Sequence, residues 1–166
     1  MKTYRAIVAI LLVAFMQSVL AQPQVARHLG DGVALIEASS SVTKVAVVVN
    51  VRAAKTADLM GDLAAPGQFP ETVLVIQSLR IDVNGSPIFV PRSAYADLLA
   101  VREAEVLVTD RVGILRLRGG DASESYLARI EFDKAMVKRR AIFNPALSER
   151  KPLQETTYYL RTMEDR

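Results

Sequence analysis

The chain of 166 residues has no cysteine, no tryptophan and a single histidine, His28. Without cysteine it can form no disulfide, no thiol nucleophile and no cysteine-ligated metal site. One histidine also excludes a multi-histidine metal site, and a Ser-His-Asp triad would have to recruit His28 from a segment ahead of the first expected strand. These absences favour a protein that is not an enzyme, and we expect it to hold no metal and no cofactor.

Long apolar runs are scarce too, and the one at the N-terminus has the pattern of a cleavable secretory signal. Lys2 and Arg5 precede an apolar run over residues 6–15, and small residues lead up to Ala21. That run is about ten residues, half of the roughly 20 that cross a bilayer, so we prefer cleavage over a permanent anchor. We expect a soluble mature chain that begins at Gln22 and is periplasmic or secreted. A lipoprotein anchor would need cysteine in place of Gln22.

Once this segment is removed, the chain has no large excess of positive or negative charge. The whole chain carries 21 basic and 18 acidic residues, a net charge of +3, and two of the basic residues belong to the signal. A nucleic-acid-binding face needs a stronger basic excess, so we expect no nucleic-acid partner. The mature chain has the length of one domain. We expect residues 22–42 to be a partly flexible N-terminal segment and residues 43–163 to form a single β-rich domain.

Apolar and polar residues alternate with a period of two along most of the mature chain, which predicts β-strands. The expected strands are 43–52, 72–83, 86–90, 103–109, 112–118, 125–133, 136–143 and 155–161. Helix is expected only over residues 53–63 and in a short segment with Ser93 as its N-cap. We therefore expect a mainly β fold, an antiparallel β-sandwich or a strongly curved sheet of about eight strands with one or two short helices.

Two short connections predict how neighbouring strands pair. Asn84-Gly85 is typical of a type I′ hairpin turn, and Pro87 restricts the returning strand to a sheet edge. The connection Lys134-Ala135 predicts a second hairpin in which Glu131 faces Lys138.

The same register singles out Arg139, Arg129 and Arg140 as a possible charge network. Arg139 would lie on the apolar face opposite Ile130, where it must extend to the sheet margin or bind a carboxylate. Arg129 would face Arg140 on the exposed side. That pair is destabilising unless both side chains splay into solvent or an acid or anion lies between them.

The most distinctive string lies between two expected strands and combines glycines, acids, hydroxyls and an aromatic residue. Its candidate partner-binding residues are Gly119, Gly120, Asp121, Ser123, Glu124, Ser125 and Tyr126. The string leads into a strand and has no lysine, unlike a phosphate-binding loop, and Tyr126 stands where a calcium loop requires glycine. Two interpretations remain: a loop that enters another protein's cleft, and a hairpin loop with a glycine bulge whose Asp121 bonds its own backbone.

From these features we expect an exported, non-catalytic domain that recognises another exported protein, for example by inhibiting or neutralising a hydrolase or toxin of the cell envelope. Two alternatives stay open. One is a small-ligand or glycan-binding site in the sandwich. The other is a carboxylate-dependent hydrolase that uses Asp121, Glu124, Glu131 and Asp133.

Overall fold

The computed structural model describes residues 24–55, 73–121, 124–147 and 150–160. The first five strands are β1 (Gln24–His28), β2 (Gly32–Ser39), β3 (Lys44–Ala53), β4 (Leu74–Val83) and β5 (Ser86–Pro87). After the 3-10 helix η2 (Arg92–Ala94) come β6 (Val101–Val108), β7 (Gly113–Gly119), β8 (Tyr126–Phe132), β9 (Val137–Phe143) and β10 (Gln154–Thr157). The signal segment expected over residues 1–21 and most of the expected helix at 53–63 lie outside the described residues.

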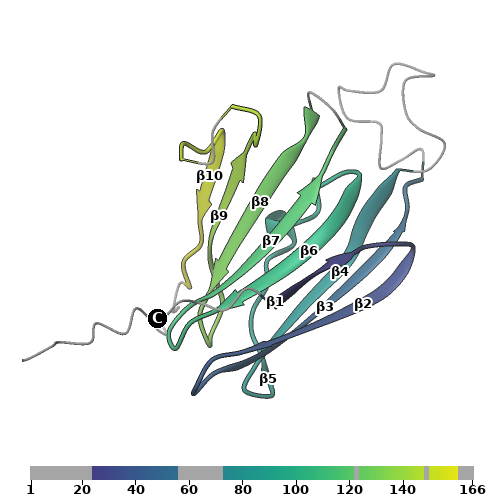
Figure 1. Cartoon of the computed structure of the whole chain (residues 1–166). Helices are drawn as coiled ribbons and strands as arrows, with labels where there is room; N and C mark the ends of the chain where they lie inside the picture. Colours follow the sequence, from purple (N-terminus) through teal and green to yellow (C-terminus); the bar gives the residue numbers. More distant parts are fainter. Residues whose placement is uncertain (1–23, 56–72, 122–123, 148–149, 161–166) are drawn as a thin grey trace, which may run out of the picture.

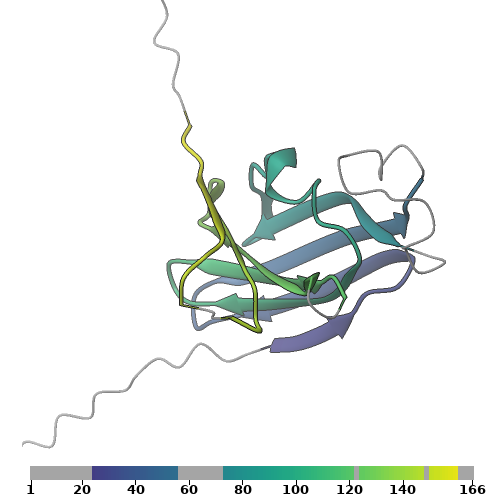
Figure 2. The same ribbon diagram turned by 90° about the horizontal axis from the view of Figure 1, so that it is seen from above.

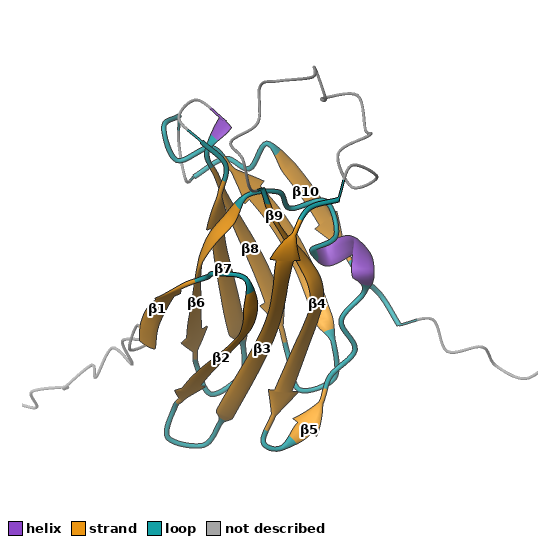
Figure 3. Ribbon diagram, turned by 90° about the vertical axis from the view of Figure 1, so that its right-hand side faces the viewer, coloured by secondary structure: helices purple, strands orange, loops and turns teal. Residues whose placement is uncertain are grey.

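The strands form two antiparallel sheets that lie face to face (Figures 1 and 2). The six-stranded sheet has the order β1-β6-β7-β8-β9-β10, and the four-stranded sheet has the order β2-β3-β4-β5 (Figure 3). The mainly β, sandwich-like fold expected from the sequence is confirmed.

Alternate residues of each strand fill the space between the sheets. In β3 the four odd-numbered valines from Val45 to Val51 are buried, while the residues between them are partly exposed. Phe132 of β8 is among the largest fully buried side chains, and its ring occupies the space where a side chain at position 113 would lie. Gly113 is therefore required by close packing. Burial of each such valine or phenylalanine contributes about 1.5–3 kcal/mol.

Two strands precede the first strand expected from the sequence, in the segment expected to be partly flexible. Leu29, between β1 and β2, is buried, and its backbone N–H donates to the Arg102 carbonyl. In β2 the residues Ile36 and Ala38 point inward, but Val33 and Leu35 on the opposite face are exposed and apolar. Apolar residues on both faces hide the period-two pattern, which is why sequence alone did not show this strand.

The segment from Pro91 to Leu98 differs from expectation at its start. Pro91 is the residue before η2 and makes no side-chain capping hydrogen bond, so Ser93 lies inside the helical turn and is not its N-cap. Tyr95 and Leu98 are buried as expected. They fix this short helical segment against the core.

The β4–β5 turn has the expected form. Asn84 and Gly85 both have positive φ, 52° and 80°, which is the geometry of a type I′ turn. Asn84 also reaches β3, because its N–H donates to the Lys44 carbonyl and its Oδ1 accepts from the Lys44 N–H, each at 2.8 Å. Pro87 lies on the exposed edge strand β5, as predicted.

The β8–β9 register follows the expectation only at its first pair. Phe132 faces Val137, but a bulge then makes Lys138 an extra residue, so that Arg139 faces Glu131. The start of β9 also bonds a third segment: Phe89 donates its N–H to the Ala135 carbonyl and accepts from the Val137 N–H. Phe89 thus forms an isolated bridge to Met136 next to the bulge.

The bulge overturns two expected placements. Arg140, not Arg139, lies opposite Ile130 on the inner face, and Arg139 lies on the outer face of the six-stranded sheet. Arg129 faces Ala141 on one side and Arg116 on the other, so it does not face Arg140.

Substitution of Gly85 tests the turn. Gly85→Val should lower the free energy of unfolding by about 1 kcal/mol or more, because a β-branched residue resists positive φ. Gly85→Asn, which tolerates positive φ, is the matched control and should cost less. Urea unfolding measures both, and a midpoint that Gly85→Val leaves unchanged would contradict the assigned turn.

Candidate functional site

The β7–β8 loop, which contains the candidate partner-binding residues, lies at one end of the sandwich. Gly120 has a φ of +77°, and a Cβ there would overlap the Glu124 carbonyl. A Cβ on Gly119 would overlap the Tyr126 hydroxyl. The Glu124 N–H donates to the Asp121 carbonyl at 2.8 Å, which closes the loop. Close packing and backbone conformation therefore explain why glycine stands at both positions. This agrees with the interpretation of the string as a hairpin loop.

Tyr126 is packed against the core and does not stand out from the loop. Its hydroxyl donates to the Leu99 carbonyl at 2.9 Å. Burial raises the pKa of Tyr126 above its ordinary value; the nearby Asp97 carboxylate adds to this, and Arg140 opposes it. Tyr126 therefore stays protonated and holds the loop to the segment before β6.

The other loop residues have different surroundings. Asp121 is exposed, and its carboxylate lies 3.6 Å from Arg102. Glu124 is exposed and Ser125 is partly exposed, whereas Ser123 lies outside the described residues. Sequence reasoning missed Ala100, which has a φ of +51° and whose carbonyl accepts the Gly120 N–H at 3.2 Å.

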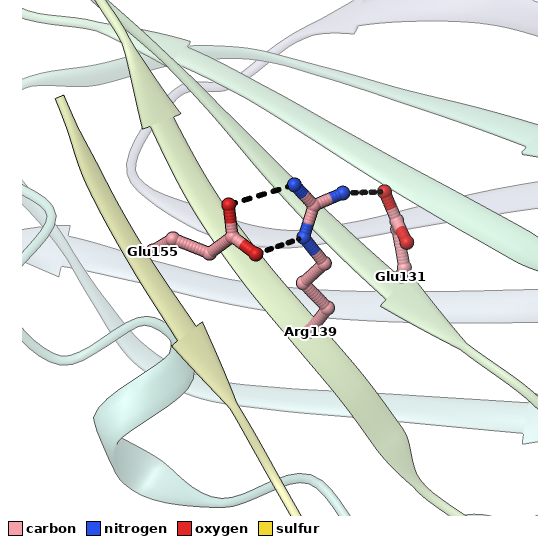
Figure 4. Close-up of polar contacts among 3 residues, drawn as sticks. All are labelled: Glu131, Arg139 and Glu155. Carbon is pink, nitrogen blue, oxygen red and sulfur yellow. Dashed lines mark hydrogen bonds and ion pairs between the residues drawn. The ribbon is translucent and has the colours of Figure 1, made fainter. Parts of the chain in front are cut away.

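Arg139 bridges three strands on the outer face (Figure 4). Its Nε and one terminal nitrogen each lie 2.8 Å from the Glu155 carboxylate, and the other terminal nitrogen lies 3.1 Å from Glu131. The hydrogen bonds that Arg139 donates to Glu155 lower the pKa of Glu155, and the same bonds raise the pKa of Arg139. The ion pair holds the short strand β10 to β8 and β9. It requires Glu155 to be ionised, so it weakens as the pH falls through the lowered pKa of that group.

Arg140 is the buried member of the expected charge network, with 3% of its surface exposed. One terminal nitrogen lies 2.8 and 2.7 Å from the two carboxylate oxygens of Asp97, and the other lies 3.2 Å from Gln154 Oε1. The side chain thus joins β9 to the segment before β6 and to β10. Sequence reasoning missed Asp97 and Gln154, because the bulge that turns Arg140 inward is visible only in the strand pairing.

Arg129 and Arg116 face each other across β7 and β8. Arg116 turns to Glu105 on β6 at 3.4 Å, and the guanidinium of Arg129 lies over the Phe143 ring at 5.7 Å from its centre. The two like charges therefore splay toward opposite neighbours, which relieves their repulsion.

The four carboxylates of the hydrolase alternative are not brought together. Asp121 and Glu124 precede β8 and Asp133 follows it, which separates the two ends by roughly 20 Å. Glu131 binds Arg139, and Asp133 accepts the N–H groups of Ala135 and Met136 and pairs with Lys138 at 3.2 Å. Burial would raise the pKa of Asp133, but these hydrogen bonds and Lys138 outweigh it and lower that pKa.

The outer edge of β10 is open: among the described residues, β10 pairs with β9 alone (Figure 1). Gln154 and Thr156 face Ile142 and Arg140, and the Tyr158 N–H donates to the Lys138 carbonyl at 2.9 Å. Since hydrogen-bonded positions alternate in an antiparallel pair, Glu155 and Thr157 point their peptide groups away from β9. The residues flanking this edge are exposed and apolar: Leu153 67%, Tyr159 83% and Leu160 62%.

The other sheet edges are less open. Strand β5 has two residues, one of them Pro87, and β1 pairs with β6 through an irregular register. Strand β2 lies against β1 and β6. These are common ways in which proteins protect an edge from pairing with another chain.

Within the described residues, no helix is long and apolar enough to cross a membrane, and no three His, Cys, Asp or Glu side chains are grouped to hold a metal ion. No protein-family model matches the chain, and neither does any curated protein or solved structure. Function is therefore inferred from the geometry of the described residues.

The Arg140–Asp97 pair can be tested by removing its partners one at a time. Asp97→Ala should lower the free energy of unfolding by about 2 kcal/mol, because it leaves a buried guanidinium short of its charged hydrogen bonds. Arg140→Met should cost less, since it replaces the charge with an apolar side chain of similar length. A larger loss for Arg140→Met than for Asp97→Ala in urea unfolding would contradict this role.

Tyr126→Phe tests the structural role of the loop. Loss of the hydrogen bond to the Leu99 carbonyl should cost about 1 kcal/mol in the free energy of unfolding. Glu124→Arg, an exposed change in the same loop, is the control and should leave stability within about 0.5 kcal/mol of the wild type. Equal stability of Tyr126→Phe and wild type would show that the hydroxyl does not anchor the loop.

Proposed function

We propose that this protein is an exported, non-catalytic recognition domain that binds an extended segment of another exported protein as an additional strand along β10. The signal-like composition of residues 1–21 supports export. The open edge of β10 supports this mode of binding, and it is the observation that carries the proposal.

Strand addition uses groups that β10 already presents. The outward N–H and C=O groups of Glu155 and Thr157 supply the main-chain hydrogen bonds that an incoming strand needs. The partner's peptide groups satisfy them in a fixed register, which gives affinity without a deep cleft. The edge is also held in place before the partner arrives, because Arg139 binds Glu155 and Arg140 binds Gln154. A preorganised edge lowers the entropic cost of binding.

The side chains around this edge indicate the chemistry of the partner segment. Leu153, Tyr159 and Leu160 are exposed beside β10 and together offer an apolar border. An extended segment with apolar side chains at alternate positions would cover them, and the tyrosine ring is the side chain best suited to contribute contact energy. We favour this surface over the β7–β8 loop, because the aromatic residue of that loop is packed inward.

The decisive variant is Thr157→Pro. Proline removes the outward N–H but leaves the β9–β10 hydrogen bonds at positions 156 and 158 in place. Capture of the partner from an envelope extract should weaken about tenfold, through one lost hydrogen bond and the bulk of the ring. Thr157→Val retains the N–H and should capture as well as wild type.

Amide hydrogen exchange distinguishes strand addition from other contacts. In the purified complex, the Glu155 and Thr157 amides should become protected, whereas those of Asp121 and Glu124 in the β7–β8 loop should not change. If Thr157→Pro unfolds at the wild-type urea midpoint and captures the partner at wild-type strength, the proposed edge is wrong. Loss of capture in Glu124→Arg would then assign recognition to the loop.

A further inference from the structure

The outer edge of β10 fits a second copy of the same strand. In a two-fold dimer, the commonest kind of oligomer, one surface meets its own copy. Two antiparallel β10 strands bond only in registers that set the outward peptide groups of Glu155 and Thr157 against one another. Three registers of these two residues do so: Glu155 faces Glu155, Thr157 faces Thr157, or each Glu155 faces the Thr157 of the other copy.

Charge and exposed apolar surface select the third register. In the first, two like charges lie directly opposite each other, which is destabilising. In the second, the exposed ring of Tyr159 faces Glu155 and gains no apolar neighbour. In the third, the two-fold axis passes Thr156, and Leu153 faces Tyr159 of the second copy. Both side chains are exposed in the single chain, and symmetry makes this apolar pair twice.

The third register also satisfies the unused hydrogen-bonding groups of the edge. Glu155 and Thr157 of the other copy exchange both N–H to carbonyl bonds, as in any hydrogen-bonded antiparallel pair. Glu155 brings no unpaired charge to this contact, because Arg139 binds its carboxylate at 2.8 Å. The bonding of this strand to β9 extends to Tyr158, whose N–H donates to the Lys138 carbonyl. The edge is therefore long enough to bring the next residue, Tyr159, into the pairing.

We propose that a second copy of this chain pairs antiparallel with β10 about a two-fold axis at Thr156, and that the partner segment competes with it for this edge. The six-stranded sheets of the two copies then form one continuous sheet, which protects the edge until the partner displaces the second copy. The competition rests on the proposed function, because the partner segment uses the same peptide groups. The dimer itself does not depend on it.

Crosslinking through one introduced cysteine tests the register. The chain contains no cysteine, so Thr156→Cys adds a single thiol. At the axis, position 156 faces its own copy in a non-hydrogen-bonded pair with Cα atoms about 4.5 Å apart, which a disulfide can span. Mild oxidation should therefore give a covalent dimer. Gln154→Cys is the matched control: it faces Tyr158, lies roughly 13 Å from its own copy and should not crosslink.

Exchange of charge tests the contact between Leu153 and Tyr159. Leu153→Glu and Tyr159→Lys should each weaken the dimer about tenfold in sedimentation equilibrium, because each change disturbs two symmetric pairs. The double variant sets a carboxylate at position 153 against an ammonium at position 159 of the other copy, and should recover much of the lost affinity. The two positions lie six residues apart on one strand and do not meet within a copy, so recovery reports pairing between copies.

Concentration separates the dimer from recognition of another protein. In the free protein, the Glu155 and Thr157 amides should be protected from exchange only at concentrations where the dimer forms. Wild type that stays monomeric up to roughly 1 mM would overturn the dimer. Crosslinking of Thr156→Cys no faster than that of Gln154→Cys would also overturn it. Neither result would touch the proposed function, which is judged by capture of the partner in Thr157→Pro.

The oxidised Thr156→Cys dimer tests the competition. Its two β10 edges are locked together, so it should lose capture of the partner from an envelope extract, and reduction of the disulfide should restore capture. Capture by the oxidised dimer at the strength of the reduced protein would overturn both the competition and recognition along β10. The crosslink itself would still establish the dimer, so failure of one proposal is distinguishable from failure of the other.

Discussion

The far half of the six-stranded sheet depends on the extra residue at the start of β9. Lys138 faces no residue of β8, and from that point each side chain of β9 lies on the face opposite to that of a regular hairpin. Arg140 is thereby turned into the interior and Arg139 out of it. Without the bulge, Arg139 would meet the apolar core and Arg140 would face Arg129, two arrangements that the nearby acids do not compensate.

The two arginines then hold the end of the sheet from both faces. Arg139 binds Glu155 on the outer face, and Arg140 binds Gln154 and the segment before β6 on the inner face. A four-residue edge strand has few ladder hydrogen bonds of its own, so these side chains contribute much of what keeps β10 in place. The strand is consequently ordered although its outer edge has no partner among the described residues, and an ordered open edge is what strand addition requires.

The parts of the fold that the sequence predicts are those decided locally. The Asn84-Gly85 turn and the edge position of Pro87 follow from the conformations open to those residues, and β3 follows from its alternating valines. The bulge could not be predicted, because the short Lys134-Ala135 connection is equally compatible with a regular register, and only the pairing itself shows that Lys138 is an extra residue. For the same reason the role of Arg140 was assigned to its neighbour, and its partner Asp97 was missed.

The β7–β8 loop shows the same limit in a functional prediction. Glycines beside acids and hydroxyls are typical of binding loops. Glycines are equally required where a tyrosine side chain packs directly against the loop backbone. The contact that gives this loop its structural role is Tyr126 with Leu99, 27 residues apart. Composition alone therefore could not reveal that role.

Lys138, the extra residue of the bulge, contacts the end of β10 through its backbone and the end of β8 through its side chain. Its carbonyl accepts the Tyr158 N–H next to β10, and its ammonium pairs with Asp133 at 3.2 Å. This ion pair is half exposed on the lysine side and therefore weak. The backbone hydrogen bond from Tyr158 does not depend on the ammonium. The position of β10 thus depends on the backbone of the bulge and not on the lysine side chain.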